Sequence, residues 1–502
     1  MALDKAGNTL SKSQKITLKT ETQSISDWVG SSDIDDFYSI SLSSRSSVSI
    51  AIDGLSANAD LQLLKDNNSN HSIDKGDVIA SSNKSGTLSE SIRETLNAGN
   101  YFIRVYSKSG NTKYDLNFFQ TSSTSSQEVY KESSVSSNTV NSTLAATSAD
   151  WFSQNLSDQK IVSLARNLAS DGKLSRQDML DIFRNVQDNS AVDSNEIQDL
   201  KALVAAGNKF NMEDHVKWLS AQVANGASVG MSASSFESNL VGRWFLGTVA
   251  PTPEFNGKKL TYTEVNGSLF GSSNKAQISD IHQGTINDCT FLAALGATFS
   301  PQSDDSGNAS SSLINSMIKD NGDNTYTVRF YSGRYYQPGE AQYVTVDRRI
   351  ATSIAAQRNN GVLWVALVEK AYAQWREWTD SRPGYNIIGN GGALAPPLSF
   401  ITGRKTTNYT PSKINFSMLE TALKAGKAIT TSRSGNDTSY ILGTHAYSVR
   451  NAYIDSNGKQ RVVVRNPWGV DGGKTKSGAN DGFINLSYDD FIKSFNLGVS
   501  IS

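Results

Sequence analysis

Residues 283–295 read Gln-Gly-Thr-Ile-Asn-Asp-Cys-Thr-Phe-Leu-Ala-Ala-Leu. A polar turn ends at Asp288, and an apolar, helix-favouring run follows Cys289. Because Asp is a preferred N-cap residue, the pattern predicts a helix that begins at the cysteine. The partial positive charge of a helix N-terminus favours the thiolate, so we expect a reactive Cys289 with a lowered pKa. A buried, inert cysteine is the alternative that this run alone leaves open.

Two downstream segments supply a base and a group that can orient it. His445 opens an alternating apolar segment, and Asn466 ends another and precedes Pro467-Trp468-Gly469. An activated nucleophile needs a base within hydrogen-bond reach, and the base needs a partner that fixes its ring. The polar turn 455–458 between the segments predicts a strand pair that brings His445 and Asn466 together. Three histidines lack this context, with His282 ranked next after His445: His71, His215 and His282.

The composition limits the classes of function. The chain has 502 residues, with 47 Lys plus Arg against 48 Asp plus Glu, and this balance excludes a large basic surface for nucleic acid. A single cysteine excludes an internal disulfide and a multi-cysteine zinc site.

Residues 1–20 contain no apolar signal core, and no apolar run is long enough to span a membrane. We expect a soluble protein without an N-terminal signal peptide, either cytoplasmic or exported by a non-classical route.

The first part of the chain alternates between apolar and polar residues. Residues 1–120 are predicted to form an all-β sandwich, because apolar residues recur at every second position between turn-rich stretches. Residues 121–150 are rich in Ser and Thr, which is typical of a linker.

The apolar spacing becomes helical over residues 151–224. Two loops there have the length of calcium-binding EF-hand loops, although Ala169 and Gln187 stand where oxygen ligands are usual. The sequence predicts a degenerate EF-hand-like module, and calcium binding by its oxygen donors stays open. These donors are Asp171, Asp178, Asn189 and Glu196.

The second half of the chain mixes helices and strands. Residues 225–254 have no strong periodicity and are predicted to be a connector, open to processing by the protein itself. We expect an α+β core of two subdomains, 255–400 with Cys289 and 401–502 with His445 and Asn466.

The helix expected over residues 361–378 has an apolar face that includes Val368 and Tyr372. Its Glu369 and Lys370 are predicted to face away from the core.

Several blocks resemble known families. QGTINDCTFLAALGA, GTHAYSV and VRNPWG resemble the active-site blocks of the calpain family of papain-like cysteine peptidases, in collinear order within 255–502. DWVGSSDIDDFYSISL and LNAGNYFIRVYSKSGNTKYDLNF, in the first 120 residues, are similar to the bacterial pre-peptidase C-terminal (PPC) domain. The resemblance implies a bacterial-type calpain-like protease core behind a PPC-like β-sandwich.

The resemblance also implies a role for each site residue. Cys289 would be the nucleophile, His445 the general base and acid, and Asn466 the residue that orients His445. Gln283 would donate to the oxyanion hole, and Trp468 would shield the His445–Asn466 hydrogen bond from water.

Calcium activates animal calpains through two sites in the protease core. Asp280 and Asp481 match one ligand of each site, but Asn386, Gly472 and Phe483 stand where the resemblance implies acidic ligands, with Asp471 a possible substitute at the second site. Since Ca²⁺ prefers several anionic oxygens, we expect no required cofactor and weak or absent calcium dependence.

The leading hypothesis is a cysteine endopeptidase that hydrolyses proteins through a Cys-His-Asn triad and an acyl-enzyme intermediate, positioned or regulated by its N-terminal modules. One alternative is an inactive adhesion or scaffold protein whose β-sandwich binds a partner. Another is a Cys-His acyl transferase.

Overall fold

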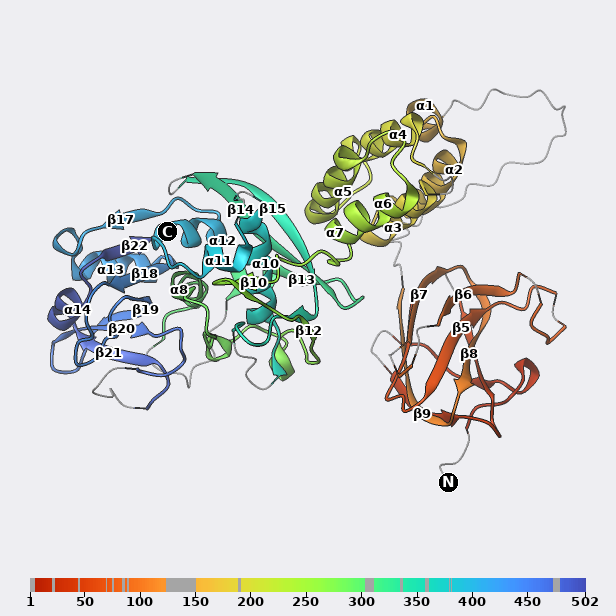
Figure 1. Cartoon of the computed structure of the whole chain (residues 1–502), viewed down its shortest axis with the longest axis horizontal. Helices are drawn as coiled ribbons and strands as arrows, with labels where there is room; N and C mark the ends of the chain where they lie inside the picture. The colour runs from red at the N-terminus through yellow and green to blue at the C-terminus, as the bar shows by residue number, and fades with distance from the viewer. Residues whose placement is uncertain are drawn as a thin grey trace, which may run out of the picture. The chain divides into compact units, whose positions relative to one another are not determined.

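The computed structural model describes residues 5–19, 23–43, 46–68, 70–74, 76–83, 86–87, 90–122, 150–187, 191–302, 311–334, 337–356, 361–378, 380, 382–472 and 479–502. The chain forms two compact units, Met1–Asn141 and Ser142–Ser502 (Figure 1). Most of the predicted linker, 123–149, lies outside the described residues.

Alternating side chains build a β-sandwich in the first unit. Two sheets share one hydrophobic core, to which Ile40, Ile50, Ile103 and Leu116 all contribute. This confirms the predicted N-terminal sandwich. Its five-stranded sheet has the order β1 (Gln14–Lys15), β3 (Asp35–Leu42), β8 (Gly99–Ser109), β5 (Asn58–Leu64) and β6 (Val78–Ser82), and its four-stranded sheet the order β2 (Gln23–Val29), β9 (Thr112–Ser122), β4 (Ser46–Asp53) and β7 (Glu90–Leu96).

The second unit begins with short helices around a separate core, in which Phe183, Phe236 and Phe245 are fully buried. Residues 225–254, predicted to be a connector, instead contain the helical elements α6, η3 and α7 and contribute Phe236 to the core. These elements are too short to show a helical periodicity of apolar residues in the sequence. The helices are α1 (Trp151–Asn155), α2 (Gln159–Leu168), η2 (Ala169–Asp171), α3 (Arg176–Asn185), α4 (Ser194–Ala205), α5 (Asp214–Gly226), α6 (Ala233–Phe236), η3 (Glu237–Val241) and α7 (Gly242–Trp244).

A three-stranded sheet, two short strand pairings and a group of helices follow, around the largest hydrophobic cluster. A three-stranded sheet has the order β13 (Ile318–Asp320), β14 (Thr325–Arg334) and β15 (Gln337–Asp347). Short two-stranded pairings join β10 (Glu254–Phe255) to β11 (Lys258–Lys259) and β12 (Thr263–Glu264) to β16 (Arg349–Ile350). The helices are η4 (Gly271–Ser273), η5 (Ile278–Asp280), α8 (Cys289–Ala297), α9 (Ser312–Met317), α10 (Trp364–Glu377), α11 (Gly384–Ile388) and α12 (Ala395–Thr402).

A six-stranded sheet with its own core completes the chain. Its order is β17 (Thr407–Tyr409), β22 (Gly498–Ile501), β18 (Ile429–Arg433), β19 (His445–Ile454), β20 (Gln460–Arg465) and β21 (Phe483–Ser487). Three helical segments accompany it: η7 (Pro411–Lys413), α13 (Phe416–Lys424) and α14 (Tyr488–Ser494).

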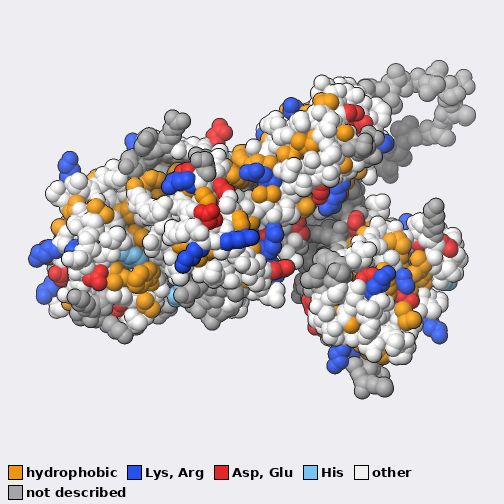
Figure 2. All heavy atoms as spheres, in the orientation of Figure 1, with side chains coloured by type: hydrophobic (Ala, Val, Ile, Leu, Met, Phe, Trp, Pro, Cys, Tyr) orange, Lys and Arg blue, Asp and Glu red, His pale blue; other side chains and the backbone are white. Residues whose placement is uncertain are grey.

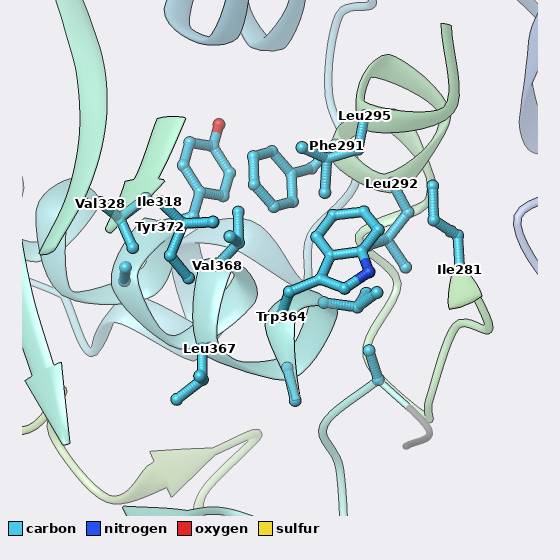
Figure 3. Close-up of a cluster of buried hydrophobic side chains, with 14 of the residues drawn as sticks. Ile281, Phe291, Leu292, Leu295, Ile318, Val328, Trp364, Leu367, Val368 and Tyr372 are labelled. Carbon is cyan, nitrogen blue, oxygen red and sulfur yellow. The ribbon is translucent and has the colours of Figure 1, made fainter. Parts of the chain in front are cut away.

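Helix α8 lies where these two parts meet, packed against β19, β18 and α12 (Figure 1). All of its residues are buried. On its other side Phe291 stacks on Tyr372 of α10, with ring centroids 3.9 Å apart (Figure 3). The predicted helix that begins at Cys289 is therefore confirmed, and it is a central element rather than a surface helix.

The prediction that Glu369 and Lys370 face away from the core is wrong. Both side chains are buried in α10, because other elements pack against that face as well. The Lys370 ammonium donates to a carboxylate oxygen of Asp347 at 2.5 Å, and burial lowers the pKa of Lys370 to about 8.

A buried polar cluster crosses the sandwich core. The Tyr114 hydroxyl donates to the Asp36 carboxylate and lies 2.7 Å from the Tyr38 hydroxyl. Burial raises the pKa of both tyrosines, so they remain neutral donors. Removing one hydroxyl leaves a buried carboxylate with one donor fewer.

We therefore predict that Tyr114→Phe lowers the free energy of unfolding of the sandwich by about 1–3 kcal/mol. Hydrogen-exchange mass spectrometry of β3 and β9 in the full chain measures this change. Tyr101→Phe is the control, because its hydroxyl donates only to the partly buried Asn97 carbonyl. Equal effects of the two substitutions would contradict a special contribution of the cluster.

Candidate active site

Cys289 is the first residue of α8 and only 9% of its surface is exposed. It shares a small apolar cluster with Ala293, Leu394 and Ala446. Its sulfur is within hydrogen-bond reach of the backbone N–H of Ala446, the residue after His445. The nucleophile candidate and the base candidate thus come from α8 and from the first residues of β19.

The expected lowering of the Cys289 pKa is wrong for this arrangement. Burial raises the pKa of the thiol to about 11, and backbone N–H groups of Ala446 and Thr290 only partly oppose that rise. The desolvation penalty of a thiolate therefore exceeds the benefit of the helix N-terminus.

Asp288 occupies the predicted N-cap position, but its side chain makes no capping hydrogen bond. The carboxyl group is fully buried and hydrogen-bonds to the carboxyl group of Glu369 on α10 instead. The expectation of a side-chain cap is therefore wrong, because the stronger constraint on this carboxyl group is a tertiary contact.

The predicted strand pair is confirmed, since β19 and β20 are antiparallel neighbours. His445 begins β19 and Asn466 directly follows β20, which places His445 Nε2 2.8 Å from Asn466 Oδ1. Both residues are buried. Burial lowers the pKa of His445, and the hydrogen bond that His445 donates to Asn466 Oδ1 raises it in part.

Trp468 lies beside the imidazole, with ring centroids 5.1 Å apart. Its backbone N–H donates to Asn466 Oδ1 at 2.9 Å, so one oxygen holds both the imidazole and the turn. Trp468 is 45% exposed. The Asn466 amide in turn donates to the Asp471 carbonyl at 3.3 Å.

Gln283 reaches the same turn from the other part of the chain. Its backbone N–H donates to the Pro467 carbonyl at 2.9 Å, and its side-chain amide donates to the Ile286 carbonyl at 2.6 Å. Gly284 is required next to it, because a Cβ there would lie 2.1 Å from the Ala355 carbonyl oxygen. The loop 354–356 therefore supports the Gln283 turn.

The two weak candidates for calcium ligands in the protease core accept hydrogen bonds from other residues. Asp280 accepts from the Trp364 indole at 2.6 Å and from the Gln277 backbone at 2.9 Å. Asp481 accepts from the Phe483 backbone at 3.0 Å. Among the described residues, no group of three or more His, Cys, Asp or Glu side chains is placed to hold a metal ion.

The candidate calcium loops of the helical module have a similar arrangement. Asp178 and Glu196 accept from the backbones of Ser175 and Asp193 in capping boxes at the starts of α3 and α4. Asp171 accepts from the Lys173 backbone at 2.9 Å. Asn189 lies outside the described residues.

Sequence reasoning missed two residues near the site. Glu369 was assigned to the outside of its helix, and Asp471 was considered only as a substitute calcium ligand. Asp471 is buried and accepts from the Gly482 backbone at 3.1 Å, which supports the turn after Asn466. A charged residue inside a strongly apolar helix was the available signal for Glu369.

Acidic and basic side chains are interspersed on the face shown in Figure 2, in line with a net charge of −1. No helix in the described parts of the chain is both long and apolar enough to cross a membrane.

Two family models match parts of the chain. Residues 260–481 match the calpain family cysteine protease model, and residues 35–107 match the bacterial pre-peptidase C-terminal domain. The chain therefore contains an N-terminal PPC domain and, later in the sequence, a calpain-family cysteine protease domain. This confirms the two resemblances seen in the sequence.

Individual relatives are distant. The chain is 26% identical to the calpain-type cysteine protease DEK1 of Arabidopsis thaliana over 39% of its own length and 9% of the relative's. It is 27% identical to the calpain-like protease palB/cpr-8 of Neurospora crassa over 38% of its length and 22% of the relative's. It thus spans less than a quarter of either protein. The pre-peptidase C-terminal domain of a Bacillus anthracis collagenase is 18% identical over 21% of this chain and 92% of that one, with a TM-score of 0.18.

We predict that Asn466→Ala lowers the pKa of His445 further, because it removes the acceptor that favours the imidazolium. NMR titration of the imidazole measures the shift, with the resonance assigned by its loss in His445→Gln. His215 is the internal control, since burial lowers its pKa to about 4 within the helical module. An unchanged or raised His445 pKa would contradict the role given to Asn466.

Proposed function

We propose that this chain is a calpain-like cysteine endopeptidase in which Cys289, His445 and Asn466 form the catalytic triad. The observation that carries the proposal is the 2.8 Å hydrogen bond between His445 and Asn466 beside the chain's single thiol. The calpain-family domain over residues 260–481 supports the reaction class, and a protease implies protein substrates.

The proposed reaction begins with a neutral thiol and a neutral imidazole. His445 takes the proton from Cys289 as the sulfur attacks the carbonyl carbon of the scissile peptide bond. The carbonyl oxygen becomes an oxyanion, which the Cys289 backbone N–H and the Gln283 amide stabilise in this proposal. His445 then gives the proton to the departing amine, which leaves an acyl-enzyme thioester.

Water completes the cycle. His445 accepts a proton from water as the water oxygen attacks the thioester, and the sulfur leaves with that proton to regenerate the thiol. Asn466 keeps the ring in the tautomer with hydrogen on Nε2, so that Nδ1 can exchange the proton with Cys289. Trp468 reduces the access of water to the hydrogen bond between His445 and Asn466.

The finer architecture is part of the same proposal. The helical elements around α8 and α10 and the six-stranded sheet would be the two subdomains of a papain-like core. The helices between 151 and 224 would be a degenerate EF-hand-like module, in which a backbone hydrogen bond from Leu174 to the Phe210 carbonyl joins two interhelical loops.

The decisive test is cleavage of a fluorogenic peptide library by the full chain. We predict that Cys289→Ala and His445→Ala each lower kcat/KM by about a thousandfold or more, because each removes a group that acts in the transition state. His71→Gln is the matched control in the sandwich and should cleave like the wild type. Wild-type rates in Cys289→Ala would contradict the proposal.

We also predict that peptidase activity in a chelator equals that in millimolar calcium. Asp280 already receives two hydrogen bonds, and an amide stands at Asn386, where its side chain donates to Glu254 at 3.3 Å. A hard cation needs anionic oxygens that this arrangement does not supply. Activity found only with calcium would overturn the prediction, and Asp280→Asn would then show whether the first site is responsible.

A further inference from the structure

Two buried carboxyl groups lie in contact next to the candidate nucleophile, Cys289. Asp288, the residue before Cys289, and Glu369, in the middle of α10, are both 0% exposed. Their side chains hydrogen-bond to each other. Within the described chain, neither oxygen of Asp288 nor Oε1 of Glu369 has a hydrogen-bond partner among the N–H and hydroxyl groups of other residues.

Such a contact requires a proton. An ionised carboxylate only accepts hydrogen bonds, so two carboxyl groups can bond only if one of them carries hydrogen. Burial raises the pKa of both groups, and the negative charge of Asp288 raises that of Glu369 further. Paired acids in other active sites hold a proton for the same reason, since two close carboxylates repel each other.

The second oxygen of Glu369 has a different role. Glu369 Oε2 accepts from the backbone N–H of Ala356 at 2.9 Å. This loop supports the Gln283 turn, because the Ile354 carbonyl accepts from Thr285 at 3.1 Å and Gly284 lies against it. One side chain therefore joins the first turn of α8 to the loop that supports Gln283.

The surroundings of the pair contain weak acids. Titratable groups that feel the charge of the pair include Cys289 on α8, Tyr372 on α10 and Tyr385 on α11. The adjacent cation, Lys370, is bonded to Asp347. The charge of the pair is therefore felt directly by the thiol, which the Asp288 charge disfavours as a thiolate.

We propose that Glu369 is a positioning residue for Cys289. The Oε1–H group of Glu369 donates to the Asp288 carboxylate, and its Oε2 accepts from the loop 354–356 that supports the Gln283 turn. The shared proton limits the pair to one negative charge beside the thiol and fixes α8 against α10. This inference rests on the proposed function in one respect, namely that Cys289 is the nucleophile.

The sign of the pH effect follows from the raised pKa values. The folded pair retains a proton that the unfolded chain releases in the ordinary carboxyl range. Its stabilising effect therefore falls as pH rises above that range and is lost as pH passes the pKa of the folded pair. The released proton goes to solvent and leaves two buried carboxylates next to the thiol.

Alkylation of Cys289 by iodoacetamide across a pH series tests the inference, and the chain's single cysteine makes the readout unambiguous. We predict that Glu369→Ala slows alkylation at neutral pH by about tenfold, the equivalent of one pKa unit of the thiol. Glu369→Gln, which restores a donor, should return to near the wild-type rate. Asp288→Asn should move the alkylation midpoint to lower pH, because it removes negative charge beside the sulfur.

Glu420→Gln makes the same chemical change on α13, where Glu420 pairs with Lys424, and should match the wild type. If Glu369→Ala does not fold, the profiles of Glu369→Gln and Asp288→Asn still decide. The inference is overturned if Asp288→Asn titrates like the wild type, or if Glu369→Gln is alkylated about tenfold more slowly than the wild type.

The two proposals fail separately, because alkylation needs no peptide. If the wild type cleaves peptides but the Glu369 and Asp288 variants have the same alkylation profiles as the wild type, the role of Glu369 is overturned and the proposed function stands. The expected order of profiles without any peptidase activity would support that role and overturn the proposed function.

Discussion

The packing of the N-terminus of α8 against the start of β19 is the constraint on which the site depends. Cys289 is brought to the Ala446 backbone N–H by a helix that is buried along its whole length. A helix with no solvent-facing side can keep such a position only if every neighbour fits, since buried side chains pack at crystal-like density. The stacking of Phe291 on Tyr372 and the small residues Ala293 and Ala446 provide that fit.

The same burial determines the resting protonation state. Desolvation raises the pKa of Cys289 and lowers that of His445, so each group favours its neutral form. In the proposed reaction, a neutral pair places the proton transfer within the attack on substrate rather than before it. The hydrogen bond from His445 to Asn466 then has two effects, because it orients the ring and partly restores its basicity.

The sequence patterns correctly predicted the features that depend on neighbouring residues alone. The helix at Cys289, the strand pair that joins His445 to Asn466 and the alternation of the sandwich all follow from short-range periodicity and turns. The side chains of Asp288 and Glu369 were misplaced because their positions depend on each other, across residues distant in the sequence. Periodicity identifies the most apolar face of a helix but does not show whether a second layer covers the opposite face.

Helix α10 shows how a helix can be covered on all sides and still carry ionisable side chains. Glu369 and Lys370 are adjacent in sequence and both buried, yet each has a separate partner, Asp288 in one case and Asp347 in the other. Buried charges contribute little net stability compared with apolar packing, but leaving one unpaired is strongly destabilising. The two pairs therefore act mainly by disfavouring other positions of α10, because a rotation or shift of the helix would leave Glu369 and Lys370 buried without their partners. In this structure the acid that precedes Cys289 is one of those partners, so the register of α10 and the position of the thiol are set together.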